Sequence, residues 1–146
     1  MNIALLSSYR SKDPNTRVGA CIINGDNNRI LSIGYNGMPN NIPDEKLTWK
    51  KGDNWTNNKK FYVVHAELNA ILNYQASFDS VSNKVLYTTL FPCNECMKAI
   101  IQTGISKIIY LYDDQKGKDS DCAARYMAMQ AGIELVELKN CPRLEI

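Results

Sequence analysis

Residues 84–96 read Lys84-Val85-Leu86-Tyr87-Thr88-Thr89-Leu90-Phe91-Pro92-Cys93-Asn94-Glu95-Cys96. The first seven of these residues predict a strand over 84–90. Pro92 suits the start of a helix, because the N–H group that proline lacks would have no partner there. We expect this helix over 93–103, closed by Gly104. A strand that leads directly into a helix is typical of α/β folds.

The alternation continues on both sides of this unit. The pattern predicts a short helix over 1–10, with Ile3, Leu6 and Arg10 on one face. The remaining elements are strands at 18–23 and 29–35 joined by the hairpin loop 24–28, a helix over 65–76, a strand at 107–112, a helix over 119–131 ended by Gly132, and a strand at 133–138. This order predicts an α/β fold with three layers, α/β/α, around a mixed five-stranded sheet. We expect a single domain over 1–146.

The chain has one histidine, in His65-Ala66-Glu67, and 24 residues separate Glu67 from Pro92-Cys93-Asn94-Glu95-Cys96. His65, Cys93 and Cys96 offer one imidazole and two thiolates to a metal, and Glu67 remains as a free carboxylate. Catalytic zinc sites take three protein ligands and keep one position open, whereas structural sites take four. This signature occurs in zinc-dependent nucleobase deaminases, in which the glutamate moves protons.

A structural zinc site and a redox pair are weaker interpretations of the Cys-x-x-Cys motif. A structural zinc site needs a fourth Cys or His, and none of the remaining cysteines, Cys21, Cys122 and Cys141, is paired at ligand spacing. A redox pair of the thioredoxin type accounts for neither His65 nor Glu67. The predicted helix starts at the metal residues favour thiolates, because unpaired N–H groups and the helix dipole stabilise negative charge there.

The composition indicates a globular protein of one ordinary domain, with 146 residues, 45% hydrophobic and 22% charged. A net charge of +2 does not favour wrapping a polyanion but is compatible with a small phosphorylated ligand. Five cysteines, an odd number, indicate a reducing compartment. No run reaches transmembrane length, and Ile3-Ala4-Leu5-Leu6 is too short for a signal sequence. We expect a cytoplasmic protein without a membrane partner.

Four stretches of the sequence resemble motifs of the deoxycytidylate (dCMP) deaminase family. The stretches are Ser11-Lys12-Asp13-Pro14-Asn15-Thr16-Arg17-Val18-Gly19-Ala20-Cys21, Gly34-Tyr35-Asn36-Gly37-Met38-Pro39, His65-Ala66-Glu67-Leu68-Asn69-Ala70-Ile71 and Leu90-Phe91-Pro92-Cys93-Asn94-Glu95-Cys96. The resemblance implies a cytidine-deaminase-like fold and zinc-dependent hydrolysis of dCMP to dUMP for thymidylate synthesis. It also implies a homo-hexamer activated by dCTP with Mg²⁺ and inhibited by dTTP.

The resemblance assigns roles to several residues. His65, Cys93 and Cys96 resemble the zinc ligands, and Glu67 resembles the catalytic residue that carries a proton from water to ring N3 and assists the departure of ammonia. Asn36 resembles the residue that binds the sugar hydroxyl, although an Asn before Gly37 is also typical of a turn. The backbone N–H of Ala66 is expected to meet the pyrimidine carbonyl.

The phosphate contact is less specific in the sequence. Ser11, Lys12 and Asn15 offer a hydroxyl, an ammonium and an amide near the expected pocket, and a solvated turn ending at Pro14 accounts for them equally well. Tyr112 is a further candidate, although aromatic residues at strand ends are commonly packing residues. Family members commonly have a tyrosine slightly downstream, where this chain has residues 113–116.

The long polar segment 36–58, here called the flap, contains Trp49 and Trp55. Five lysines lie in it or directly after it: Lys46, Lys50, Lys51, Lys59 and Lys60. The pattern is compatible with stacking on single-stranded nucleic acid, and it is also typical of a solvated flap whose tryptophans pack on protein. In the family this region lies near the effector nucleotide. The resemblance therefore implies effector contacts from Gly34, Tyr35, Gly37, Asn40, Asp44 and Glu45. Asn73 and Ala76 differ from regulated relatives, and the flap lacks a second Cys/His cluster for another zinc.

Three alternatives to a dCMP deaminase remain open. The protein would be a bifunctional dCMP/dCTP deaminase if its pocket admits a triphosphate. A polynucleotide cytosine deaminase is disfavoured by the modest charge and by the lack of an arginine-rich strand-binding loop. A zinc-binding protein without catalysis would leave Glu67 without a role.

Overall fold

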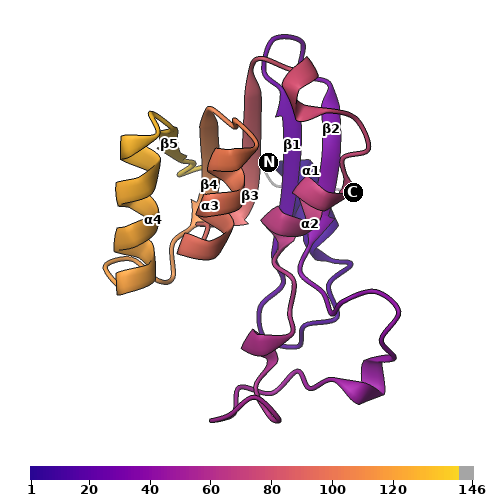
Figure 1. Ribbon diagram of the computed structural model, residues 1–146. Coiled ribbons are helices and arrows are strands. Elements are labelled where there is room, and N and C mark those ends of the chain that lie inside the picture. The colour runs from indigo at the N-terminus through magenta and orange to yellow at the C-terminus, as the bar shows by residue number, and fades with distance from the viewer. Residues whose placement is uncertain (142–146) are drawn as a thin grey trace.

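The structure is a computed structural model and describes residues 1–141. It contains a five-stranded sheet in the order β2-β1-β3-β4-β5 (Figure 1). The strands are β1 (Gly19–Asn24), β2 (Ile30–Tyr35), β3 (Lys84–Leu90), β4 (Lys107–Tyr112) and β5 (Glu134–Glu137). The helices are α1 (Asn2–Ser8), α2 (Ala66–Asn73), α3 (Asn94–Gln102) and α4 (Asp119–Gln130). Three short 3-10 helices lie at η1 (Asp44–Lys46), η2 (Lys59–Phe61) and η3 (Phe78–Ser80).

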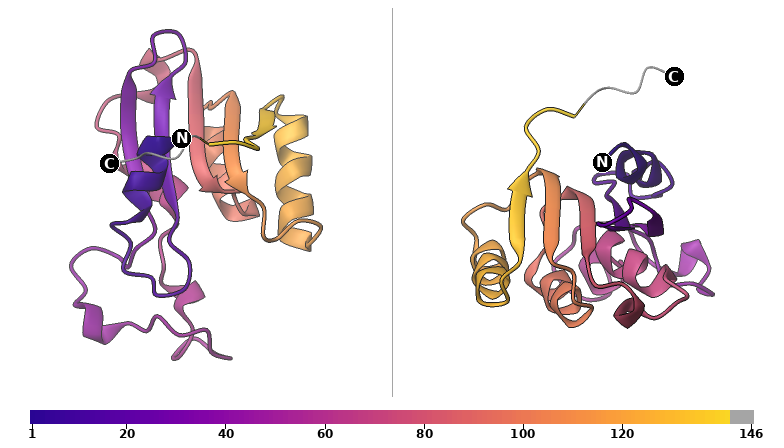
Figure 2. Two further views of the ribbon diagram at one scale, coloured as in Figure 1. Left: turned by 180° about the vertical axis from the view of Figure 1, so that it is seen from behind. Right: turned by 90° about the horizontal axis from the view of Figure 1, so that it is seen from above.

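The sheet is mixed, as the order of elements predicts. Strand β1 pairs antiparallel with both β2 and β3, and β3, β4 and β5 run parallel. Helices α2, α3 and α4 cover one face of the sheet, and α1 lies on the opposite face over β1 and β2 (Figure 2). The three-layer α/β/α expectation is therefore confirmed.

The main core lies between the sheet and α2, α3 and α4. Ile22, Leu86 and Ile108 point from neighbouring strands into it, and each is fully buried. Alternation along β3 places Thr88 on the same face as Leu86, since successive side chains of a strand point to opposite faces. Thr88 is fully buried beneath the first turn of α2.

Helix α1 packs with a different face from the one its sequence indicates. Ile3 and Leu6 are 40% and 39% exposed, whereas Ala4, Ser7 and Ser8 are buried. The cause is a close approach to β1: a Cβ atom on Gly19 would lie 1.9 Å from the carbonyl oxygen of Ala4. Only small side chains fit at this contact, so the larger apolar residues of α1 point outward.

The expected flap is irregular in structure and extends away from the sheet (Figure 1). At its start, Gly37 pairs with Val64, just before α2, in an isolated β-bridge, and a second bridge, between Lys51 and Asn58, lies within the flap itself. No helix among residues 1–141 is long and apolar enough to cross a membrane.

Candidate metal and substrate site

The candidate metal donors lie at the starts of two neighbouring helices. His65 is the N-cap of α2 and Cys93 is the N-cap of α3, and neither side chain caps its own helix. Cys96 lies in the first turn of α3 and is 4% exposed. Pro92 directly precedes the N-cap Cys93, and both sulfurs lie next to His65 at the start of α2.

The three donors form a compact cluster. His65 Nδ1 lies 3.4 Å from Cys93 Sγ and 3.4 Å from Cys96 Sγ, and all three donor atoms lie within 4.8 Å of one another. Tetrahedral zinc with ordinary Zn–N and Zn–S bonds places a nitrogen and a sulfur about 3.5 Å apart. The donor set therefore fits zinc in both chemistry and spacing, with Nδ1 as the ligating nitrogen.

The two thiols differ in how readily they ionise. Hydrogen bonds from Cys96 and His65 lower the pKa of Cys93 to about 4. The pKa of Cys96 is raised, because its thiol is hydrogen-bonded to Cys93 and because burial disfavours its thiolate. Without a cation only one of the two sulfurs is readily ionised, whereas a divalent metal between them stabilises both thiolates.

Glu67 lies on the first turn of α2, next to this cluster, and is 4% exposed. Its Oε1 atom lies 3.2 Å from Thr88 Oγ1. Burial raises the pKa of Glu67. A buried carboxyl with a raised pKa next to a metal site is suited to taking up and releasing protons.

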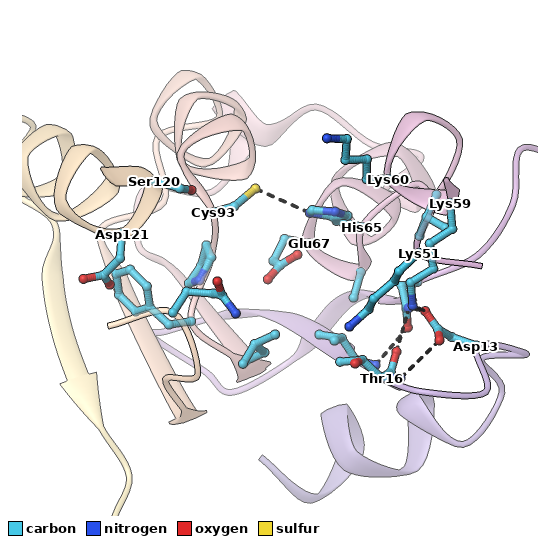
Figure 3. Close-up of a pocket in the computed structure, with 18 of the residues that line it drawn as sticks. Asp13, Thr16, Lys51, Lys59, Lys60, His65, Glu67, Cys93, Ser120 and Asp121 are labelled. Atoms are coloured by element: carbon cyan, nitrogen blue, oxygen red, sulfur yellow. Dashed lines mark hydrogen bonds and ion pairs between the residues drawn. The ribbon is translucent and has the colours of Figure 1, made fainter. Parts of the chain in front are cut away.

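A cavity of about 400 Å³ opens over these residues. Figure 3 shows Ser120 and Asp121 at one end, Asp13 and Lys51 at the other, and Cys93, Glu67 and His65 between them. The lining comprises Asp13, Thr16, Val18, Asn36, Lys51, Asn58, Lys59, Lys60, Val63, His65, Ala66, Glu67, Leu90, Phe91, Pro92, Cys93, Gln115, Ser120 and Asp121. Strand ends, helix starts and the flap thus enclose one site of nucleotide-like size.

Asn36 lines the cavity, and its amide orientation is fixed by the protein. Its Nδ2 group donates to Thr16 O at 3.0 Å and to Asp13 Oδ2 at 3.4 Å. Its Oδ1 atom accepts from Val18 N at 2.8 Å. Both N–H groups are therefore used, and one lone pair of Oδ1 remains for a ligand. Asn36 can meet a ligand only as an acceptor.

Arg125 supports the opposite wall of the cavity. Its guanidinium lies 4.1 Å from the centroid of the Phe91 ring and forms ion pairs with Asp113 and Asp121. Asp121 in turn accepts from the backbone N–H of Gly117 at 2.9 Å. The loop before α4 and the Phe91 wall are thereby held together, and the charge of Asp121 is partly balanced by an arginine that it shares with Asp113.

The residues expected at the phosphate lie outside the cavity lining of the described chain. Ser11 is buried, and its hydroxyl accepts from Asp13 N at 3.2 Å. Lys12 is exposed and forms an ion pair with Asp44. Asn15 is exposed as well, and Tyr112 is 58% exposed at the end of β4. The structure does not bring these four side chains to the metal cluster.

The candidate effector residues fall on β2 and on the start of the flap. A Cβ atom on Gly34 would lie 2.3 Å from both Ala66 O and Ala70 N, so this glycine permits α2 to pack on β2. Gly37 N donates to Val64 O at 3.1 Å. The Tyr35 ring lies 5.1 Å from the Arg10 guanidinium, and Asn40, Asp44 and Glu45 are exposed.

Most lining residues were not expected at the site from the sequence, among them the charged residues Asp13, Lys51, Lys59 and Lys60. The three lysines belong to the basic residues that made nucleic-acid contact an alternative for the flap. Lys59 is 9% exposed and forms an ion pair with Asp13, which is 2% exposed. Local sequence patterns give no signal for this pair, because 46 residues separate its members.

Comparison with known proteins agrees with the site. The family profile described as "Cytidine and deoxycytidylate deaminase zinc-binding region" matches residues 1–112. The chain is 48% identical to the deoxycytidylate deaminase of Homo sapiens over 148 residues, which cover 100% of this chain and 82% of that protein. It is 49% identical to a probable deoxycytidylate deaminase of Drosophila melanogaster over 140 residues, which cover 92% of this chain and 68% of that protein.

A solved structure is also similar. The dCMP deaminase of cyanophage S-TIM5, in complex with dCMP and dUMP, matches with a TM-score of 0.69 and 25% identity over 94% of this chain and 92% of that chain. His65, Cys93 and Cys96 form the zinc site of the present chain. The chain belongs to the cytidine and deoxycytidylate deaminase family.

Proposed function

We propose that this protein hydrolyses dCMP to dUMP and ammonia and so supplies dUMP for thymidylate synthesis. The observation that supports this most strongly is the arrangement of Glu67, buried beside the zinc donors His65, Cys93 and Cys96 at the bottom of a cavity of nucleotide size. Relatives that the chain matches over most of its length have the name deoxycytidylate deaminase.

Zinc held by His65, Cys93 and Cys96 would lower the pKa of water to about 7 and so supply a nucleophile at neutral pH. Glu67 accepts the proton of the attacking water and delivers it to ring N3 of the cytosine. The same carboxyl then takes the second proton, from the hydroxyl added at C4, and transfers it to the amine, which leaves as ammonia when the C4–N bond breaks. One buried group serves each transfer because its raised pKa allows it to hold and release a proton in the same cavity.

Two further residues orient the nucleoside. Ala66 is the first residue of α2, where a backbone N–H has no acceptor within the helix. In our proposal this N–H donates to the pyrimidine carbonyl. Asn36 has one free lone pair on Oδ1, so a sugar hydroxyl would donate to it.

We assign the phosphate contact to Lys51 and Lys60, both in the cavity lining. Among the described residues neither lysine forms an ion pair, whereas Lys59 is paired with Asp13 and Asp121 is paired with Arg125. The unbalanced charge at the cavity, apart from Glu67 and the metal donors, is therefore positive. A phosphate monoester carries about −1.5 to −2 charges at neutral pH, which matches two lysines.

The test is ammonia release from dCMP, dCTP, CMP, deoxycytidine and single-stranded DNA. We expect dCMP to be the best substrate. Lys51→Ala and Lys60→Ala should each raise the KM for dCMP severalfold and leave kcat/KM for deoxycytidine unchanged. Lys46→Ala, an exposed flap residue outside the lining, is the control. Equal use of CMP and dCMP, or a preference for deoxycytidine, would refute the proposed specificity.

We also propose a homo-hexamer in which dCTP with Mg²⁺ activates and dTTP inhibits. The exposed apolar side chains Ile3, Leu6 and Tyr9 on α1 support association between chains. Sigmoidal dCMP kinetics that become hyperbolic with dCTP and steeper with dTTP would support the control. Hyperbolic kinetics unaffected by either nucleotide, from a protein that sediments as a monomer, would contradict it.

Two broader assignments accompany this proposal. We propose that residues 1–146 form one domain. Residues 142–146 lie outside the described part of the chain, and within residues 1–141 all five strands join one sheet. We propose a cytoplasmic location, since the five cysteines are all free and a reducing compartment maintains that state.

A further inference from the structure

We propose that Asp13 and Lys59 are positioning residues: they hold the flap against the cavity and orient Asn36 for the sugar of the nucleotide. The identity of the ligand rests on the proposed function, whereas the contacts do not depend on it. The pair joins the loop between α1 and β1 to the residue that directly follows the flap.

Asp13 is the centre of a buried polar cluster, defined here as Asp13, Asn36 and Lys59. Its Oδ1 atom accepts from Asn15 N at 2.9 Å and from Thr16 N at 3.1 Å. Its Oδ2 atom accepts from Lys59 Nζ and, at 3.4 Å, from Asn36 Nδ2. A carboxylate has about four lone-pair positions, so this one is fully bonded. Asp13 thereby fixes its own loop, the end of the flap and the Asn36 amide together.

Lys59 connects this cluster to the flap through its backbone. Lys59 N donates to Lys50 O at 2.7 Å, and the adjacent Asn58 forms a β-bridge with Lys51. The flap therefore folds back on itself where Lys59 leaves it, and Lys51 is part of that fold. Movement of Lys59 away from Asp13 would displace Lys51, which we assign to the phosphate.

A second ion pair, between Lys12 and Asp44, joins the same loop to the flap but is far more exposed to solvent. The side chains of Lys12 and Asp44 are 69% and 53% exposed, whereas those of Lys59 and Asp13 are 11% and 2% exposed. Solvent screens the first pair and weakens it. The second pair lies in a region of low dielectric, where removal of one partner leaves the other charge without compensation. The buried pair is therefore the contact that determines the position of the flap.

The expected defect is in binding rather than in chemistry. Lys59→Met leaves the Asp13 carboxylate uncompensated at the cavity, where it repels a phosphate. Asp13→Asn removes the charge that attracts Lys59 and weakens the contact that orients Asn36. Within residues 1–141 neither side chain hydrogen-bonds Glu67 or a zinc donor, so the deamination step itself is preserved.

The experiment compares Asp13→Asn, Lys59→Met and the double variant with wild type. The matched control is Lys107→Met, which removes a partly exposed ion pair with Glu134 between β4 and β5. The measurements are KM and kcat for dCMP, zinc content, and hydrogen exchange of the flap amides in the zinc-loaded protein. Lys59→Arg keeps a positive charge opposite Asp13 and tests whether that charge is enough to restore the KM for dCMP. It also replaces Lys59→Met in the comparison if that variant does not fold.

Each single variant should raise the KM for dCMP about tenfold, which corresponds to a loss of about 1.4 kcal/mol of binding free energy. We expect kcat within about threefold of wild type, full zinc content and faster exchange of the flap amides. The KM of the double variant should rise by less than the product of the two single effects, since paired residues are not additive. Lys59→Arg should lie near wild type, and Lys107→Met should change neither KM nor exchange.

Folded, zinc-loaded single variants whose KM and flap exchange match wild type would overturn the proposal. So would a loss confined to kcat, because that would place the pair in the chemical step. If the wild-type protein does not deaminate dCMP, the proposed function fails. Hydrogen exchange then still decides whether Asp13 and Lys59 hold the flap.

Discussion

Thr88 Oγ1 lies 3.2 Å from Glu67 Oε1 and 3.0 Å from Leu90 O. A hydroxyl has one hydrogen and can donate to only one of these acceptors at a time. When the hydroxyl donates to Leu90 O, a hydrogen bond between Glu67 and Thr88 requires a protonated Glu67 carboxyl, which then donates to Thr88 Oγ1. Thr88 is therefore a shared and weak partner of Glu67.

Thr88→Val should reduce kcat by no more than about fivefold, since a net hydrogen bond contributes about 1 kcal/mol. Valine has nearly the same shape as threonine and fills the buried space beneath α2. Steady-state kinetics with dCMP measures this effect, and Thr88→Ser, which keeps the hydroxyl, is the control. A loss of more than a hundredfold would show that Thr88 orients Glu67 far more strongly than the shared hydrogen allows.

Glu67→Gln should retain the fold and zinc but lose nearly all turnover. The amide can hydrogen-bond water but cannot carry a proton. General acid–base groups contribute about 10²–10⁴-fold, and several transfers here pass through one residue, so we expect the upper end of this range or beyond. Single-turnover kinetics with zinc analysis on the same sample is the measurement. Retention of about a tenth of wild-type activity, far above that range, would place the proton transfer elsewhere.

Gly34→Ala should destabilise the protein by several kcal/mol, as steric overlap at close-packed sites does. The added Cβ atom would lie 2.3 Å from Ala66 O and Ala70 N, which are backbone atoms of α2. Because α2 presents His65 and Glu67, zinc affinity should fall as well. Thermal unfolding and a zinc competition titration are the two measurements.

The control for Gly34→Ala is Gly132→Ala, at a helix end with φ +70° and no atom within 4 Å of the added Cβ. This change should cost only about 1 kcal/mol, from left-handed backbone strain. It should leave zinc binding unchanged. Equal effects of the two substitutions would contradict close packing as the reason for Gly34.

The free energy of unfolding of wild type should exceed that of Asp13→Asn near neutral pH, and this difference should shrink as the pH falls. Burial opposes the ionised form of Asp13, but Lys59 and the N–H groups of Asn15 and Thr16 outweigh burial and lower its pKa. A carboxyl with a lowered folded-state pKa adds stability above its unfolded pKa of about 3.9, and this stability is lost as pH falls through the folded-state value.

Chemical denaturation of both proteins between neutral and acidic pH tests this expectation. The advantage of wild type over Asp13→Asn should be constant near neutral pH. It should shrink below about pH 4. An advantage that grows on acidification would mean that the folded-state pKa of Asp13 is raised.

The order of elements was predictable because the chain has clear start and stop signals. The predicted strands at 84–90 and 107–112 coincide with β3 and β4, and Gly104 and Gly132 adopt positive φ at the predicted helix ends. The metal donors were predictable for a related reason: they lie within short motifs at the starts of helices, so their spacing alone determines where they meet.

The other site contacts depend on long-range packing, which local patterns do not encode. Asp13 belongs to a recognisable motif, but its partner Lys59 directly follows the flap, far from Asp13 in the sequence. The loop at 11–17 turns Asp13 and Thr16 toward the cavity and leaves Lys12 and Asn15 in solvent. The outward face of α1 likewise follows from its contact with Gly19, which no periodicity of α1 reveals.

The central claim is that the zinc held by His65, Cys93 and Cys96, together with Glu67, deaminates dCMP. The most direct measurement is ammonia release from dCMP by purified protein of known zinc content, alongside the Cys93→Ala, Cys96→Ala double variant. We predict about one zinc per chain, because three protein ligands form one catalytic zinc site. We also predict that dUMP and ammonia form in equal amounts. The double variant should lose both the metal and the activity. Zinc-loaded wild-type protein that releases no ammonia from dCMP, or a double variant that keeps more than half of its zinc, would contradict this claim.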